Sequence, residues 1–119
     1  MEVRRGQVWR IRLSDDTKGS EQSGDRFCIV ISNNVGNHYA PVVTVALITS
    51  KDKDVNKKKI QPTHVKLMIH KPSLIMTEQM MTVSKERLYE YFGKVDNNTM
   101  KQVDKAIEIA LGLCEGYNK

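Results

Sequence analysis

The sequence predicts a mostly β domain of the α+β type, in which a small antiparallel, barrel-like sheet is followed by one C-terminal α-helix. The chain has 119 residues, the length of one ordinary domain, so we expect a single domain over residues 1–119. Most apolar segments alternate with polar residues or form short β-branched runs between turn residues, and both patterns are typical of strands. Helical spacing occurs in the last segment, and strands without intervening helices should pair mainly antiparallel.

Three strands are predicted in the first half of the chain. In Gln7–Leu13, three apolar side chains alternate with Arg10 and Arg12, which indicates a half-buried strand. Phe27–Ile31 and Val42–Ile48 are continuous apolar runs rich in β-branched residues, consistent with strands that are buried on both faces.

Polar segments separate or follow these strands. Ser14–Asp25 is rich in Asp, Ser, Gly and Lys and is predicted to be a long loop. Ser32–Pro41 contains three Asn, one Gly and one Pro, so it is expected to be a connection built from turns. Lys51–Lys59 is predicted to be a basic loop.

Three further strands are predicted in the second half. Thr63–Ile69 alternates again, and Ser73–Val83 continues as another strand. Leu88–Val95 follows a short turn at Ser84–Arg87. The sequence therefore predicts five or six short strands before the C-terminal helix.

The C-terminal helix is indicated by the spacing of its apolar residues. Those residues are Met100, Val103, Ile107, Ala110, Leu111 and Cys114. Thr99 and Gln102 are spaced for a capping box at its start, and Gly116 stands where a helix would end.

The excess positive charge is a local feature. The chain has a formal net charge of +5, and residues 51–71 contain seven Lys and two Asp, so this segment accounts for all of it. Such a run is either a solvated loop that favours solubility or an electrostatic site for a phosphate backbone. Charge alone does not decide between the two.

Composition excludes several classes of protein. The longest apolar stretch is far too short to span a bilayer, and the first residues lack the apolar core of a secretory signal. Cys28 and Cys114 are expected to be small buried hydrophobes in a reducing, cytoplasmic setting. No Cys-x-x-Cys or His/Cys cluster has metal-ligand spacing, so we expect neither a metal nor a cofactor.

The histidines and the known short motifs do not by themselves identify an enzyme. His38, His64 and His70 are candidate acids or bases by type, although polar surface positions explain all three better. His64 and His70 would share a face only if the strand ran unbroken to His70. The sequence contains no nucleophile elbow and no phosphate-binding Gly-rich loop.

Two positions at strand ends fit phosphate chemistry. Arg26 follows a polar, glycine-flanked loop at the start of a buried strand, where a guanidinium could bind a phosphate, or could instead pair with Glu21 or Asp25. Thr49 lies where a buried strand meets the basic segment, and its hydroxyl is either a strand-end hydrogen-bonding group or a catalytic contact.

An ordered set of short segments carries a family resemblance. These segments are Arg5-Gly6-Gln7-Val8-Trp9, Gly19-Ser20-Glu21-Gln22 with Gly24 and Arg26, Ser32-Asn33-Asn34-Val35-Gly36-Asn37, Ala46-Leu47-Ile48-Thr49, Pro62-Thr63-His64-Val65, Glu78-Gln79 and Val103-Asp104-Lys105-Ala106-Ile107. Together they extend over essentially the whole chain and resemble the MazF/PemK family of toxin endoribonucleases.

The resemblance implies an SH3-like β-barrel with a C-terminal helix, assembled as a homodimer. It implies metal-independent cleavage of single-stranded RNA at a short recognition sequence, by a toxin whose cognate antitoxin has an acidic, partly disordered tail. It also implies that Arg26 and Thr49 are the catalytic pair. The expected products are a 2′,3′-cyclic phosphate and a 5′-hydroxyl, formed by attack of the RNA's own 2′-OH.

The resemblance and the polar chemistry of unpaired bases together suggest RNA-contacting residues. These candidates are Glu21, Gln22, Asn33, Asn37, Ser73, Gln79, Lys57, Lys58 and Lys59. Glu78 has an alternative, structural role.

The sequence departs from the family pattern in places that bear on specificity. Phe27 stands where the family commonly has Pro, and Met81 and Ser84 replace a usual Arg and Asp. Lys51–Ile60 is longer and more basic than usual. Two other functions stay open: a non-catalytic relative that inhibits DNA gyrase, and an RNA-binding module without turnover.

Overall fold

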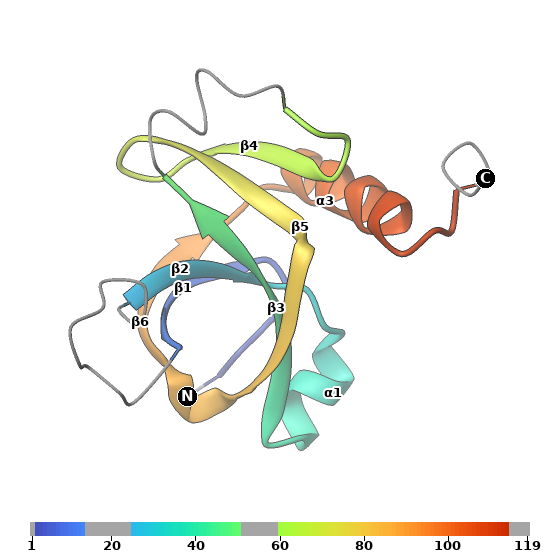
Figure 1. The fold of residues 1–119 in the computed structure, drawn as a ribbon. Coiled ribbons are helices and arrows are strands. Elements are labelled where there is room, and N and C mark those ends of the chain that lie inside the picture. Colours follow the sequence, from blue (N-terminus) through green and yellow to red (C-terminus); the bar gives the residue numbers. More distant parts are fainter. Residues whose placement is uncertain (1, 14–24, 51–59, 115–119) are drawn as a thin grey trace.

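The computed structural model describes residues 2–13, 25–50 and 60–114. The elements in chain order are β1 (Gln7–Arg12), β2 (Asp25–Val30), α1 (Asn34–Tyr39), β3 (Val42–Thr49), β4 (His64–Met68), β5 (Pro72–Ser84), the 3-10 helix η2 (Lys85–Arg87), β6 (Leu88–Lys94) and α3 (Asn97–Ala110). All six strands form one sheet in the order β4-β5-β3-β2-β1-β6, and every neighbouring pair is antiparallel (Figure 1). The expected mostly β fold with a C-terminal helix is confirmed.

The sheet is strongly curled. Figure 1 shows β1, β2, β3, β6 and the second half of β5 curving around one interior, while β4 and the first half of β5 extend beyond it and pack against α3. The change of direction occurs in β5, because Ala46 of β3 pairs with Met80 and the next residue, Leu47, pairs with Met76. The three residues between those partners form an irregularity, which bends the strand and increases its twist.

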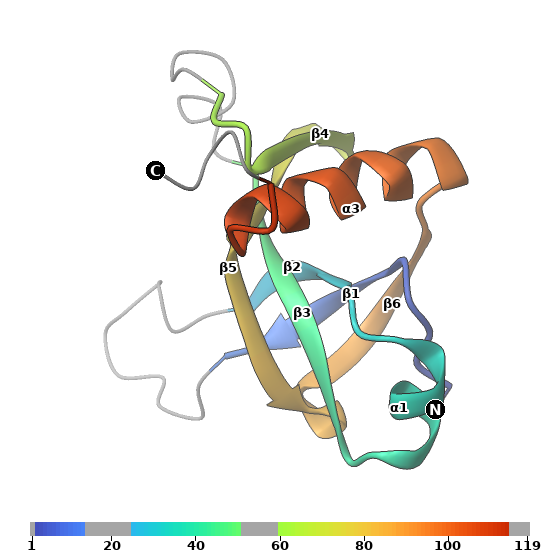
Figure 2. The ribbon, with the colours of Figure 1, turned by 90° about the vertical axis from the view of Figure 1, so that its right-hand side faces the viewer.

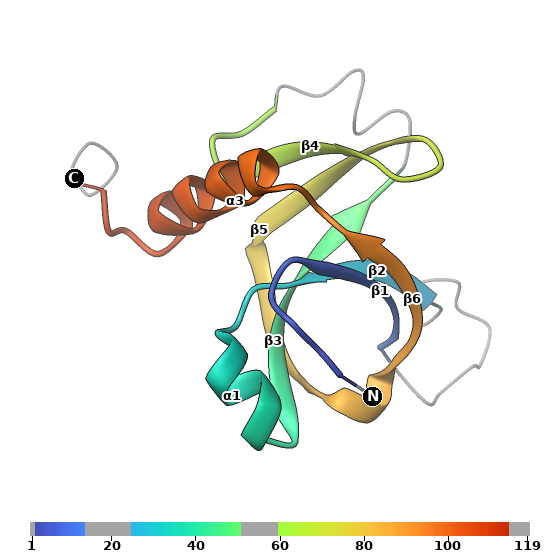
Figure 3. The ribbon, with the colours of Figure 1, turned by 180° about the vertical axis from the view of Figure 1, so that it is seen from behind.

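The two faces of the curled sheet support two hydrophobic cores. The first core lies inside the curl and contains Val3, Trp9, Ile11, Cys28, Val30, Val43, Val45, Leu47, Val83 and Leu88. The second core lies between the other face and α3 and contains Val8, Ile29, Ala46, Ile48, Val65, Ile75, Val95, Val103 and Ala106. Figures 2 and 3 show α3 lying across this second face, with α1 at a distance from it. Burial on both faces explains why the central strands are continuous apolar runs.

The predicted strands are confirmed, with ends that differ by one or two residues. Asp25 is the first residue of β2, and Thr49 is the last residue of β3. The predicted turn at Ser84–Arg87 contains the 3-10 helix η2, which Ser84 caps. The predicted loops at residues 14–24 and 51–59 lie outside the described residues.

The segment Ser32–Pro41 is not a connection made of turns alone, because it contains the six-residue helix α1. Asn33 is the N-cap of this helix, and its side chain accepts a hydrogen bond of 2.7 Å from the backbone N–H of Gly36. Asn is a strong turn residue and an equally strong N-cap. A helix of this length is too short to show its own periodicity, so the turn residues dominated the prediction.

The helix α3 is confirmed, but both predicted ends were wrong. Asp96, and not Thr99, is the N-cap, and its carboxylate accepts a 2.7 Å hydrogen bond from the Thr99 backbone N–H. The helix ends at Ala110 and is followed by Gly112, whose positive φ of 74° favours glycine. The expected stop at Gly116 lies outside the described residues.

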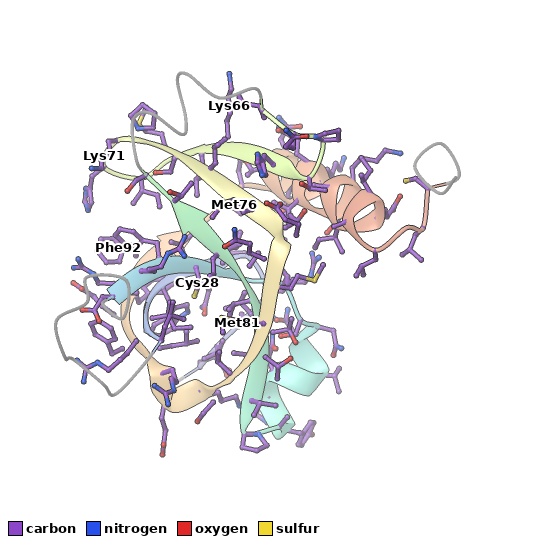
Figure 4. All side chains as sticks on the ribbon, in the orientation of Figure 1. Cys28, Lys66, Lys71, Met76, Met81 and Phe92 are labelled. Atoms are coloured by element: carbon purple, nitrogen blue, oxygen red, sulfur yellow. The ribbon has the colours of Figure 1, made fainter. Side chains whose placement is uncertain are left out.

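The two cysteines differ in their surroundings. Cys28 is fully buried in the first core, as expected, and burial raises the pKa of its thiol to about 12 (Figure 4). Cys114 lies beyond the end of α3 and is half-buried, so its expected position on the apolar face of the helix is corrected.

Candidate functional site

Arg26 and Thr49 face each other on neighbouring strands. The β2–β3 register pairs Phe27 with Ile48, and one step further along it brings Arg26 opposite Thr49. The Arg26 Nη2 donates a hydrogen bond of 3.4 Å to the Ile48 carbonyl oxygen. The antiparallel sheet therefore joins two residues that are far apart in the sequence.

The position of this pair follows from strand alternation. Side chains two residues apart share a face of a sheet, so Arg26 lies on the face of Cys28 and Thr49 lies on the face of Leu47. Both of those residues belong to the first core, and the pair stands where that core reaches the ends of the strands. Thr49 is 8% exposed and Arg26 is half-buried, so the guanidinium is the more accessible of the two groups.

Arg26 forms no ion pair with a residue in the described part of the chain. Asp25, one expected partner, instead lies 4.0 Å from Arg12, and Glu21, the other, is outside the described residues. The Ile48 carbonyl accepts from one of the five N–H donors of a guanidinium. A guanidinium held in this way can donate two parallel hydrogen bonds to a phosphate.

The end of the sheet that carries this pair also carries the tip of the β4–β5 hairpin. Figure 1 shows the start of β2, the end of β3 and this tip on one side of the molecule. Thr49 pairs with Leu74 in β5, and Ser73 is the next residue. Ser73 is buried, and its hydroxyl donates to the Lys71 carbonyl at 3.0 Å. Alternation places its side chain on the opposite face from Thr49.

Gln79 and Glu78 lie in the irregular part of β5, away from the Arg26–Thr49 register. Gln79 is exposed. Glu78 accepts hydrogen bonds of 2.9 Å from Thr63 and 2.9 Å from the His64 ring. Burial acts to raise the pKa of the Glu78 carboxyl, but the hydrogen bonds from His64, its own backbone and Thr63 outweigh it, so the pKa is lowered.

Asn33 and Asn37 lie beyond the other end of β2 from Arg26. A six-residue strand is about 20 Å long, so within one chain these amides are remote from the Arg26–Thr49 pair. Asn37 is 1% exposed, and its Nδ2 donates to the Ser32 carbonyl at 2.8 Å. Asn33 caps α1. Their contacts hold the turn after β2, and RNA contact by either stays a prediction.

The other predicted contacts lie outside the described residues: Glu21, Gln22, Lys57, Lys58 and Lys59. The basic segment begins two residues after Thr49 in the chain, so the two features are neighbours in sequence.

His64 and His70 do not share a face of one strand, because β4 ends at Met68 and His70 lies in the hairpin turn. In the described parts of the chain, no three His, Cys, Asp or Glu side chains gather around a possible metal site.

Sequence reasoning missed an aromatic group beside the pair. Phe27 stacks edge-to-face with Phe92, with ring centroids 4.7 Å apart, and Phe92 does the same with His70 at 5.4 Å. The Arg10 guanidinium lies over the Phe27 ring at 5.4 Å. Strand alternation predicted that Arg10 lies on the polar face of its strand. The contact between Phe27 and Phe92 could not be predicted in the same way, because the two residues are 65 positions apart in the sequence.

Comparison with known proteins identifies the family. The model of the PemK-like, MazF-like toxins of type II toxin–antitoxin systems matches residues 4–111. The chain belongs to this family. It is 44% identical over 116 residues to an endoribonuclease MazF of Staphylococcus saprophyticus, covering 93% of this chain and 92% of that protein. The expected family and enzyme class are thereby confirmed.

Solved structures agree with this assignment. A mycobacterial endoribonuclease in complex with its cognate antitoxin has a TM-score of 0.74 and 25% identity, over 94% of this chain and 97% of that one. MazF from Deinococcus radiodurans has a TM-score of 0.73 over 94% of this chain and 98% of that one, and its 17% identity shows a shared fold. Within the described residues, no helix is long and apolar enough to cross a membrane.

Proposed function

We propose that this chain is a metal-independent endoribonuclease toxin that cleaves single-stranded RNA through attack of the 2′-OH on the adjacent phosphate. The observation that carries the proposal is the placement of Arg26 and Thr49 next to each other, one register step beyond the Phe27–Ile48 pair of β2 and β3. A cation and a hydroxyl beside each other are suited to a phosphate whose charge increases in the transition state. Membership of a family that contains endoribonucleases supports the choice of RNA.

Arg26 and Thr49 have different roles in this mechanism, because a guanidinium and a hydroxyl differ in charge and acidity. An arginine has a pKa above about 12 and is a poor base, but it is a strong donor to an anionic phosphorane. Arg26 therefore stabilises the developing charge, and the proton that it passes to the departing 5′-oxygen is replaced by the proton that the attacking 2′-OH loses, so the guanidinium ends the step protonated. Thr49, which is 8% exposed at the end of β3, donates a hydrogen bond to a phosphoryl oxygen.

The proposal includes two protein partners. A second copy of the chain would complete the RNA groove, because Asn33 and Asn37 lie far from Arg26 within one copy. The acidic tail of a cognate antitoxin would compete with RNA for positively charged surface, and a solved relative in complex with its antitoxin supports such a partner. We retain a cytoplasmic location and a single domain over 1–119 as predictions.

The chemistry of the products tests the proposed function. Incubation of the purified protein with an unstructured RNA in EDTA should give fragments with 2′,3′-cyclic phosphate and 5′-hydroxyl ends at a short recurring sequence. Fragments with 5′-phosphate ends, or a requirement for added Mg²⁺, would contradict the mechanism. Absence of cleavage combined with inhibition of DNA gyrase supercoiling would favour the gyrase alternative instead.

A further inference from the structure

Four side chains from four parts of the chain form a continuous row beside the proposed site. The row, Arg10–Phe27–Phe92–His70, joins β1, β2, β6 and the β4–β5 turn. Its contacts are the cation–π pair of Arg10 with Phe27 and the two edge-to-face ring pairs described above. We refer to it as the planar row.

The inner and outer members of the planar row differ in exposure. Phe27 and Phe92 are half-buried and pack against the second core, so they act as a base for the row. His70 is exposed, and the Arg10 side chain retains 42% of its accessible surface. The row therefore presents a flat imidazole and a flat guanidinium to solvent, one at each end. Phe92 contacts the imidazole, and the guanidinium is held by Phe27 and by the Glu90 carboxylate at 3.5 Å.

Holding polar planar side chains in fixed orientations at the surface has an energetic cost. Polar planar side chains gain hydration when they are free, and a fixed orientation removes rotamer freedom. Proteins that bind single-stranded RNA commonly stack unpaired bases on aromatic rings, histidine or arginine planes. Fixed planes of this type reduce the ordering cost of binding a base.

The planar row lies at the end of the sheet that carries Arg26 and Thr49. Phe27 directly follows Arg26, and Figure 4 shows Phe92 between the start of β2 and the hairpin tip that carries Lys71. Lys71 is exposed next to His70, and Arg12 lies over Tyr89 at 5.5 Å on the same side of β1 as Arg10. Cations and planar groups thus lie at the same end of the sheet as the proposed site, on the opposite face of β2 from Arg26.

We propose that the planar row is a stacking subsite that binds an unpaired base flanking the scissile phosphate of the RNA, with His70 and Arg10 as the stacking groups. This inference rests on the proposed function. Because Phe27 follows Arg26 and points to the opposite face of β2, the stacked base belongs to a nucleotide next to the cleaved step and not to the attacking ribose itself. The row would therefore affect affinity and site choice more than the chemical step.

A coupling experiment between His70 and the RNA tests the subsite. A single-stranded RNA containing the cleaved sequence is made resistant with a 2′-O-methyl group at the attacking ribose. A series of such RNAs then carries one abasic nucleotide at each flanking position. Wild-type protein should lose about tenfold in affinity for one member of the series. His70→Ala should bind the intact RNA about tenfold more weakly and should show no further loss with that same abasic RNA.

A matched control is present elsewhere in the chain. His38 is also an exposed histidine and stacks edge-to-face on Tyr39 at 4.6 Å, but it lies on α1, beyond the other end of β2. Because α1 belongs to the groove proposed for the second copy, the control is the response to the abasic RNA: His38→Ala should keep the wild-type loss of affinity for that abasic RNA. Phe92→Leu, which keeps an apolar side chain against the second core, should reproduce the effect of His70→Ala in a smaller degree.

The outcomes separate the subsite from the function on which it rests. If wild-type protein cleaves RNA but His70→Ala and Phe92→Leu keep the wild-type affinity and the wild-type response to every abasic position, the subsite is contradicted alone. If wild-type protein neither binds nor cleaves RNA, both proposals are contradicted. If His70→Ala weakens binding of the cognate antitoxin and leaves RNA affinity unchanged, the planar row is a protein-binding surface and the proposal is overturned.

Discussion

At the scale of single residues, the number of hydrogen bonds that a polar side chain forms within the protein distinguishes structural groups from groups that can bind a ligand. Thr49 and Arg26 use little of their capacity within the described residues, whereas Glu78, His64 and Thr63 satisfy one another. Glu78 therefore connects β5 to the start of β4 through two hydrogen bonds. This contact supports the structural alternative for Glu78.

The lowered pKa of Glu78 predicts an acid-dependent loss of stability. A carboxyl whose pKa is lower in the folded state stabilises the fold above its unfolded value of about 4.3, and that contribution is lost as the pH falls through the folded value. Glu78→Gln should therefore be less stable than the wild type at neutral pH, and the difference should shrink on acidification. Urea unfolding between pH 7 and pH 3 measures it, with Glu86→Gln as a surface control. A difference that stayed constant with pH would contradict the role of the charge.

At the scale of elements, strands were predictable because their alternation and apolar runs are local signals. Helix α1 was missed because six residues show no period, and both ends of α3 were misplaced because several residues near each end are capable caps. Asp96, Thr99 and Gln102 all suit the first turn, and only the structure shows that the carboxylate of Asp96 caps the helix. The irregularity in β5 likewise has no signal in an otherwise continuous strand pattern.

The observed cap of α3 gives a prediction at this scale. Asp96→Ala removes the acceptor for the Thr99 backbone N–H and should lower the thermal midpoint of unfolding. Thr99→Ala should lower it less, because the Thr99 side chain is not the cap. Thermal unfolding followed by circular dichroism compares the two variants. A larger effect from Thr99→Ala would mean that the helix begins at Thr99, as the capping-box pattern suggested.

At the scale of the whole molecule, the sheet brings together residues that the sequence keeps apart. The family resemblance allowed Arg26 and Thr49 to be named as a pair, but their facing positions depend on the β2–β3 register. The planar row depends on three strands and a turn at once, and so no linear pattern contains it. Long-range placement of side chains is therefore the part of the site that residue spacing could not supply.

The charge distribution gives a prediction for the molecule as a whole. If the basic segment contacts the phosphate backbone, replacement of Lys57, Lys58 and Lys59 by Gln should weaken RNA binding and reduce the slope of log K against log salt by up to about 2. Replacement of Lys94, Lys101 and Lys105 removes the same charge from β6 and α3 and should change the slope much less. Binding titrations from 50 to 300 mM salt compare the two variants. Equal slopes in both would show that the basic segment is only a solvated loop.

The most direct test of the central claim is the rate of RNA cleavage by Arg26→Ala and Arg26→Lys, measured in EDTA beside Arg4→Ala. Arg4 is exposed in the N-terminal segment, and its loss should leave the rate unchanged. Arg26→Ala should remove detectable cleavage while the protein keeps its thermal midpoint. Arg26→Lys should restore little activity, because an ammonium lacks the forked donors that bind a phosphate in two places. Cleavage by Arg26→Ala at the wild-type rate would contradict the proposed site.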